Sequence, residues 1–157
     1  MTSVLSLGSN LGDRRAHLRA GLDVIASWFA VRAVSPLYET APVGVTDQPA
    51  FLNCVAIVDT DDPFLAWGAA RAAEETRGRS RSRRWGPRTL DVDVIAVDAV
   101  VRDDPVLTLP HPRAHERAFV LRPWLDVEPD ADIPGRGPAW RLLRDVPAAD
   151  VSAAEPW

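Results

Sequence analysis

Apolar residues follow two kinds of spacing along this chain. Short apolar runs bounded by turn residues are typical of strands, whereas Leu18, Leu22, Ile25 and Phe29 recur at the spacing of one helix face. The short runs predict strands at 4–7, 31–38, 51–58 and 90–95, with the return strand of a hairpin near 100–101. The helical patterns predict helices at about 13–30, 62–77, 119–125 and 140–143.

The two long helices begin and end at residues that favour helix termini. Asp13 and Asp62 can each accept a hydrogen bond from a free backbone N–H at a helix start, and Pro63 suits the first helical position. Gly78 can end the second helix. Residues 39–50 include two prolines, a glycine and an aspartate, and they predict a turn-rich loop.

The predicted order is strand, helix, strand, strand, helix, strand. This order is typical of a ferredoxin-like α+β fold, in which an antiparallel-dominated sheet has helices packed on its faces. We find no internal repeat and no linker, so residues 1–157 are expected to form one domain. No role can be assigned to the proline-rich tail at 147–157.

Composition argues against several classes of protein. Of the 157 residues, 46% are apolar and 25% are charged, as in globular domains, and the formal net charge of -4 argues against a protein that coats nucleic acid. No apolar stretch approaches the roughly 18 residues that a membrane span needs, and the N-terminus does not resemble a signal peptide. The single cysteine, Cys54, lies in an apolar run and fits a reducing cytoplasm. We expect a cytoplasmic protein.

Two carboxylates in the last predicted strand are the strongest sign of chemistry. Asp91 and Asp93 are two residues apart, so their side chains leave the same face of the strand, about 6.5–7 Å apart at Cα. Two solvated carboxylates on an exposed face are the alternative interpretation. The apolar neighbours Leu90, Val92 and Val94 favour a buried strand, where unpaired charge is costly. A hard divalent cation such as Mg²⁺ suits the gap.

Arginines crowd the segment just before these carboxylates. All 18 basic residues of the chain are arginine, so phosphate contacts here must come from guanidinium groups, histidine or backbone N–H groups. A charge run is often only a solvated loop. Beside a carboxylate–metal centre, however, guanidinium groups are suited to hold a polyphosphate. The candidates are Arg79, Arg81, Arg84 and Arg88.

A second set of residues is suited to a planar heteroaromatic ring. Phe51 and Asn53 share a strand face, and the Asn53 amide offers both a donor and an acceptor. Trp85 and Phe119 could add flat stacking surfaces, although core packing is the alternative for each aromatic residue. His111 lies between two prolines and could donate a hydrogen bond to a phosphate.

Taken together, these residues closely resemble the 6-hydroxymethyl-7,8-dihydropterin pyrophosphokinase family of folate biosynthesis. The run Arg84-Trp-Gly-Pro-Arg-Thr-Leu-Asp-Val-Asp93 is highly specific, and the other segments are strong in combination. These segments, in family order over nearly the whole chain, are 7–13, 38–44, 47–53, 84–93, 109–112 and 117–119.

The resemblance implies a monomeric, Mg²⁺-dependent diphosphotransferase that moves pyrophosphate from ATP to the pterin hydroxymethyl group and releases AMP. It implies two Mg²⁺ ions bound by Asp91 and Asp93, and catalytic roles for these and for Arg79, Arg81, Arg84 and Arg88. ATP would contact Glu74, Arg84, Arg88, His111, Pro112 and Arg117. The pterin would contact Gly8, Thr40, Pro42, Val43, Phe51, Asn53, Trp85 and Phe119.

Two other classes of function remain as alternatives. A ferredoxin-like sheet with an arginine loop could bind RNA, but the acidic net charge and the missing aromatic strand motif of RNA-recognition domains argue against it. A nucleotide sensor could keep the fold without the chemistry. The presence of both aspartates and Arg88 favours an active enzyme.

Overall fold

The structure, a computed structural model, describes residues 1–41, 47–78, 89–146, 151–153 and 156–157. Its strands are β1 (Ser3–Ser9), β2 (Val31–Val34), β3 (Tyr38–Thr40), β4 (Phe51–Val58), β5 (Asp91–Val97), β6 (Asp132–Ile133), β7 (Gly137–Pro138) and β8 (Val151–Ala153). Its helices are α1 (Arg14–Trp28), α2 (Pro63–Thr76), the short 3-10 helix η1 (Ala114–Glu116), α3 (Ala118–Val127) and α4 (Ala139–Asp145). None of the described helices is long and apolar enough to cross a membrane.

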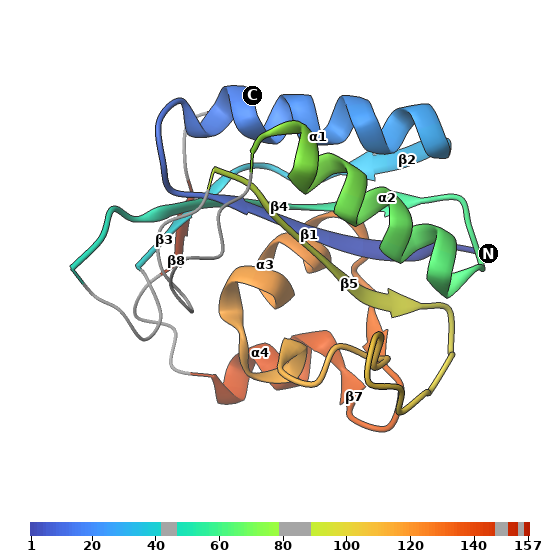
Figure 1. Ribbon diagram of the computed structural model, residues 1–157. Coiled ribbons are helices and arrows are strands. Elements are labelled where there is room, and N and C mark those ends of the chain that lie inside the picture. The colour runs from blue at the N-terminus through green and yellow to red at the C-terminus, as the bar shows by residue number, and fades with distance from the viewer. Residues whose placement is uncertain (42–46, 79–88, 147–150, 154–155) are drawn as a thin grey trace.

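Six strands form the main sheet. Its order is β5-β1-β4-β3-β8, with β2 also paired to β4, and each described pairing is antiparallel. Helices α1 and α2 lie over one face, and α3 and α4 lie on the other side (Figure 1). The predicted α+β fold, with an antiparallel sheet and helices on its faces, is confirmed.

Both faces of the sheet are buried because helices cover each of them, and alternation sends the side chains of one strand into both cores. Leu5 and Leu7 of β1 pack in the core beneath α1 and α2, where Leu18 and Ile25 meet them. Val4 instead joins the core beneath α3 and α4. The predicted helix starts are also found, since the side chains of Asp13 and Asp62 accept backbone N–H bonds at the first turns of α1 and α2.

The predicted strand at 31–38 is wrong in one respect, because it is broken into β2 and β3. Pro36 has no N–H to donate to a ladder, and the chain bends there. Ser35 bridges the break: its backbone N–H donates to the Val55 carbonyl at 2.8 Å, and its Oγ accepts from the Val55 N–H at 2.9 Å. The hydroxyl therefore replaces a backbone acceptor at this point.

The loop predicted for residues 39–50 begins too early, and the tail contains a strand that was not predicted. Glu39 and Thr40 belong to β3, where Thr40 pairs with Phe51. The tail contains β8, which pairs with β3, and the Trp157 indole N–H donates to the Ser35 carbonyl at 2.9 Å. Ladder hydrogen bonds from a distant segment therefore extend the sheet where the local pattern gives no strand signal.

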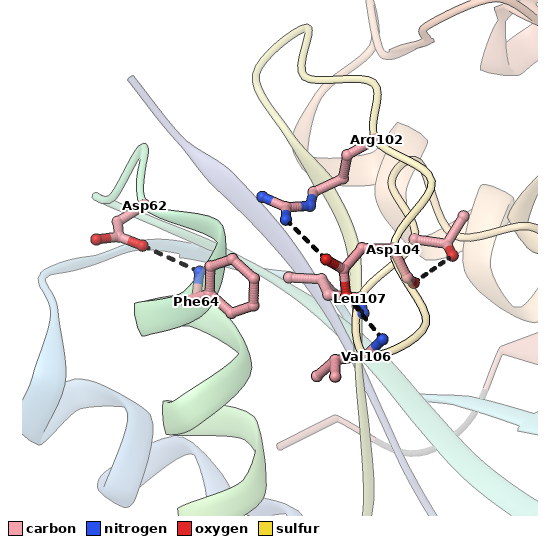
Figure 2. A network of polar contacts seen from close by, with 7 residues as sticks. Asp62, Phe64, Arg102, Asp104, Val106 and Leu107 are labelled. Carbon is pink, nitrogen blue, oxygen red and sulfur yellow. Dashed lines mark hydrogen bonds and ion pairs between the residues drawn. The ribbon is translucent and has the colours of Figure 1, made fainter.

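The return strand predicted near residues 100–101 is not formed. This segment instead forms an isolated antiparallel β-bridge between Arg102 and Leu109. Asp104 organises this segment: its Oδ1 accepts from the Val106 N–H at 2.8 Å, and its Oδ2 lies 3.2 Å from an Arg102 nitrogen (Figure 2). The Arg102 guanidinium in turn lies 4.5 Å from the centre of the Phe64 ring on α2. Side-chain contacts thus take the place of a hairpin ladder.

Candidate active site

The register of three strands brings the predicted acid and amide residues to one face of the sheet. Gly8 on β1 lies opposite Asp91 on β5 and opposite Asn53 on β4. Ser6 lies opposite Asp93 in the same way. Directly paired residues project to the same face, and this face is the one that packs on α3 through Val4 and Val55. Sequence segments far apart along the chain therefore converge here.

We call the charged side of this site the acidic edge, comprising Asp91, Asp93, Glu74, Arg71 and Arg117. Arg117 precedes α3, and its Nη1 lies 3.8 Å from Asp93 Oδ2. Burial lowers the pKa of Arg117 from its ordinary value, while the Asp93 and Asp91 carboxylates oppose that shift. Among the described residues, no three His, Cys, Asp or Glu side chains cluster as a closed metal cage. The Asp91 and Asp93 carboxylates are oxygen ligands of the kind that fits Mg²⁺, which keeps water and phosphate ligands beside one or two carboxylates.

Glu74 of α2 belongs to the acidic edge but is almost completely buried, at 2% exposure. Its Oε2 accepts from the Val92 N–H at 3.0 Å, and its Oε1 lies 3.1 Å from Arg71 Nη2. Burial raises the pKa of Glu74 to about 7, helped by the nearby Asp91 carboxyl and opposed by the Val92 N–H and Arg71. Both carboxylate oxygens are thus engaged by groups of the protein itself.

His111 lies beside the acidic edge in a defined orientation. Its backbone N–H donates to the Ile95 carbonyl at 2.8 Å, and its Nδ1 accepts from the Arg113 N–H at 3.1 Å. Burial, together with Arg117 and Arg113, lowers the pKa of His111 to about 4, although Asp91 opposes the shift. A neutral ring that accepts at Nδ1 carries its proton on Nε2. His111 is therefore arranged to donate one hydrogen bond.

We call the uncharged side of the site the neutral row, comprising Gly8, Thr40, Phe51 and Asn53. Asn53 Nδ2 donates to Thr40 Oγ1 at 2.7 Å, and both residues are buried. Gly8 allows this arrangement, because a Cβ at that position would lie 2.8 Å from Asn53 Oδ1 and 3.6 Å from the Phe51 ring. Only glycine leaves room for the amide to lie over β1.

Hydrogen bonds hold the segments next to the neutral row in place. Asn10 Nδ2 donates to Gln48 Oε1 at 2.8 Å and to the Pro49 carbonyl at 3.0 Å. Arg14 donates to the Ala50 carbonyl at 3.0 Å. On the other side, the Tyr38 hydroxyl donates to Asp126 of α3. Asn10, Arg14 and Tyr38 were not predicted as site residues. Their sequence signal is that Asn10 and Tyr38 lie within, and Arg14 directly after, segments that resemble the family.

The remaining predicted residues are placed as follows. Phe119 lies in the first turn of α3, with the Arg117 guanidinium 5.5 Å from its ring centre. Pro112 is exposed directly after His111. The other predicted contacts fall outside the described residues; they are Pro42, Val43, Arg79, Arg81, Arg84, Trp85 and Arg88.

Solved structures share this fold. The chain matches a crystal structure of Plasmodium falciparum HPPK-DHPS with pteroate at a TM-score of 0.73 and 13% identity, over 91% of this chain and 44% of that chain. A structure of an HPPK-DHPS in complex with substrates matches at a TM-score of 0.70 and 11% identity, over 91% and 43% of the two chains. This chain therefore spans less than half of those solved chains, and the likeness shows the fold.

Sequence comparisons are more specific. The chain is 46% identical over 162 residues to 2-amino-4-hydroxy-6-hydroxymethyldihydropteridine pyrophosphokinase of Mycobacterium tuberculosis, covering 94% of this chain and 85% of that protein. It is 40% identical over 126 residues to the Bacillus subtilis protein of the same name, covering 78% and 75%. A family model described as 7,8-dihydro-6-hydroxymethylpterin-pyrophosphokinase matches residues 4–129. The chain belongs to the 7,8-dihydro-6-hydroxymethylpterin-pyrophosphokinase family.

Proposed function

We propose that this protein transfers pyrophosphate from ATP to the hydroxymethyl group of 6-hydroxymethyl-7,8-dihydropterin, giving AMP and the pterin diphosphate. One observation carries the proposal beyond family membership. The strand register sets Asp91 and Asp93 of the acidic edge on the same sheet face as the Asn53 amide of the neutral row, with Gly8 between them. A polyphosphate and a flat polar ring can then be held side by side.

The acidic edge is assigned to the polyphosphate. Asp91 and Asp93 would hold two Mg²⁺ ions, which when bound would neutralise phosphate oxygens and activate the acceptor hydroxyl. Arg117, close to Asp93, can hold a phosphate oxygen while keeping its own charge compensated. His111 would donate through Nε2, since its Nδ1 is already occupied. Pro112 completes the predicted ATP contacts. Glu74, whose two oxygens are engaged by Val92 and Arg71, is assigned to ATP on family resemblance alone.

The neutral row is assigned to the pterin. The Asn53 side chain is held by Thr40, so its amide presents a fixed pattern of donor and acceptor to the ring edge. Phe51 and Phe119 would stack on the ring. Pro42, Val43 and Trp85 would complete the pocket, and Arg79, Arg81, Arg84 and Arg88 would contact the phosphates; these are assigned on family resemblance.

The arrangement divides the work of catalysis between positioning and charge. Attack by the hydroxyl on the β-phosphorus breaks the bond to the α–β bridging oxygen, and AMP leaves. Charge in phosphoryl transfer spreads over the phosphate oxygens, so fixed cations and fixed substrates supply most of the rate enhancement. No general base is assigned among the described residues.

We also propose that residues 1–157 act as a single domain, as a monomer and in the cytoplasm. The single cysteine, Cys54, is a free thiol buried in the core, which is consistent with a reducing compartment. Size-exclusion chromatography with light scattering tests the monomer directly.

The reaction is tested by measuring AMP and pterin diphosphate after incubation of the protein with ATP and Mg²⁺. Equal amounts of both products with 6-hydroxymethyl-7,8-dihydropterin present, and neither without it, are expected. Binding of ATP without AMP formation would refute the enzyme and support a nucleotide sensor. Omission of Mg²⁺, with Ca²⁺ added in its place, tests the metal requirement separately.

A further inference from the structure

The open edge of β5 lies directly beside the two carboxylates. β5 is the first strand in the sheet order, so only β1 pairs with it among the described strands. The N–H and C=O of one strand residue point to the same side, and successive residues alternate between the two sides. Val92 lies between Asp91 and Asp93, and its two backbone groups point to the open edge.

Two side chains of α2 form hydrogen bonds with these two backbone groups. Arg71 Nη2 donates to the Val92 carbonyl at 2.7 Å, and the Val92 N–H donates to Glu74 Oε2 at 3.0 Å. The same Arg71 nitrogen lies 3.1 Å from Glu74 Oε1, which closes a ring of three contacts. The pair therefore replaces the neighbouring strand that β5 lacks at this residue.

The local environment makes these contacts strong. Val92 is fully buried and the Glu74 side chain is 3% exposed, so an unpaired backbone group or charge here would be costly. Arg71 compensates the Glu74 charge, and its guanidinium lies 5.8 Å from the centre of the Trp67 ring one turn earlier on α2. Helix α2 thus holds both the N–H and the carbonyl of Val92, each through a different side chain.

We propose that Arg71 and Glu74 are positioning residues that act through Val92. By fixing the peptide groups of Val92, they set the separation and direction of the Asp91 and Asp93 carboxylates, and so the affinity of the site for Mg²⁺. The effect on turnover rests on the proposed function, whereas the effect on Val92 and on Mg²⁺ binding does not. Arg71 belongs to neither set of residues predicted to contact the substrates.

The central experiment uses Arg71→Met, which keeps the apolar stem and removes the donors. Amide hydrogen exchange at Val92 should become at least about tenfold faster. The Val55 N–H, which is also held by a side-chain oxygen, serves as an internal reference and should keep its rate. Mg²⁺ affinity, titrated calorimetrically with an ATP analogue carrying a methylene bridge between the α- and β-phosphates, should fall about tenfold.

Turnover and rescue separate positioning from general stability. In Arg71→Met, kcat should fall about tenfold while the pterin KM changes less than twofold. Arg71→Lys, whose ammonium can still donate to the Val92 carbonyl, should recover most of the Mg²⁺ affinity. Arg19→Met, the same change at an exposed arginine of α1, is the matched control and should change none of these quantities.

The proposal is overturned if Arg71→Met lowers the melting temperature but leaves Mg²⁺ affinity unchanged. It is also overturned if ATP affinity falls without Mg²⁺ and Val92 exchange stays slow, because Arg71 would then contact ATP directly. Should Arg71→Met fail to fold, Glu74→Gln keeps an amide oxygen for the Val92 N–H but lacks the charge that holds Arg71, and it should show smaller changes of the same sign. An absence of AMP formation by the wild-type protein would remove the proposed function, while the exchange and Mg²⁺ measurements would still decide the role of Arg71.

Discussion

The Asp91 and Asp93 carboxylates of the acidic edge lie on the same sheet face as the side chains of the neutral row. The two regions are nevertheless built by opposite means. In the acidic edge, charged groups compensate one another: Arg71 pairs with Glu74, and Arg117 lies near Asp93. In the neutral row, Asn53 and Thr40 satisfy each other through an uncharged hydrogen bond. The two regions are joined at Gly8, which pairs with both β4 and β5.

Their positions in the sheet explain the difference. β5 is at the end of the sheet, where side chains from α2 and from the segment before α3 can reach its carboxylates. β4 lies inside the sheet between β1 and β3, where an isolated charge would be costly to desolvate. Charge chemistry is thus confined to the edge, and recognition of an uncharged ring to the interior. The comparison predicts that changes in the two regions affect different kinetic parameters.

Removal of one carboxylate should have the largest effect. Asp93→Ala is expected to lower kcat by roughly 10³-fold, corresponding to about 4 kcal/mol of transition-state stabilisation. The pterin KM should change little, because the neutral row is intact. Steady-state assays of AMP formation check both quantities, and Asp103→Ala, at an exposed site after β5, is the control. Near-wild-type turnover of Asp93→Ala in Mg²⁺ would contradict the assignment of the metal site.

Removal of the Thr40 hydroxyl should weaken pterin binding instead. Thr40→Val keeps the shape but removes the acceptor that fixes the buried Asn53 amide. Loss of this hydrogen bond, worth about 1–3 kcal/mol, should raise the pterin KM roughly 5–150-fold. The Mg²⁺ concentration for half-maximal rate should not move. Thr108→Val, which removes a hydroxyl bonded to the Asp104 carbonyl, is the matched control. An equal change in Mg²⁺ dependence would show that the two regions are not separable.

The third prediction concerns stability against pH at the acidic edge. The pKa of His111 is lowered from its ordinary value of 6.5 to about 4 in the folded protein. The unfolded chain therefore takes up a proton first, and stability that is present above pH 6.5 is lost as pH falls toward 4. Between pH 8 and pH 5 this loss should be about 2 kcal/mol, since one pH unit corresponds to about 1.4 kcal/mol.

Urea unfolding at the two pH values checks this prediction. His111→Asn cannot titrate, so its free energy of unfolding should fall less between pH 8 and pH 5 than that of the wild type. His115→Asn, at a histidine of η1, is the control. Equal falls in wild type and His111→Asn would mean that other groups carry the acid sensitivity.

The smallest effect is expected where the tail supports the neutral row. Trp157→Phe keeps an aromatic ring but removes the indole N–H that donates to the Ser35 carbonyl. About 1 kcal/mol of stability should be lost, which for a chain of this size corresponds to roughly 2–4 °C in Tm. Differential scanning calorimetry measures the shift. If pterin KM rose severalfold while Tm hardly changed, β8 would instead act on the site through β3.

Local patterns predicted the elements around the site more successfully than their connections. The apolar run at 51–58 coincides with β4, and the caps at Asp13 and Asp62 mark the starts of α1 and α2. The return strand near 100–101 was wrong because Arg102, Asp104 and Phe64 satisfy that segment through side chains. β8 was missed because its partner, β3, is remote in sequence.

For the site, the sequence by itself determined that Asp91 and Asp93 share a strand face, since alternation depends only on neighbouring residues. It likewise determined that Phe51 and Asn53 share a face. Only the tertiary structure decided that Gly8 lies between these two pairs, that Glu74 is buried against Val92, and that His111 presents Nε2. Strand register and helix docking are set by packing between distant segments, which no local period encodes.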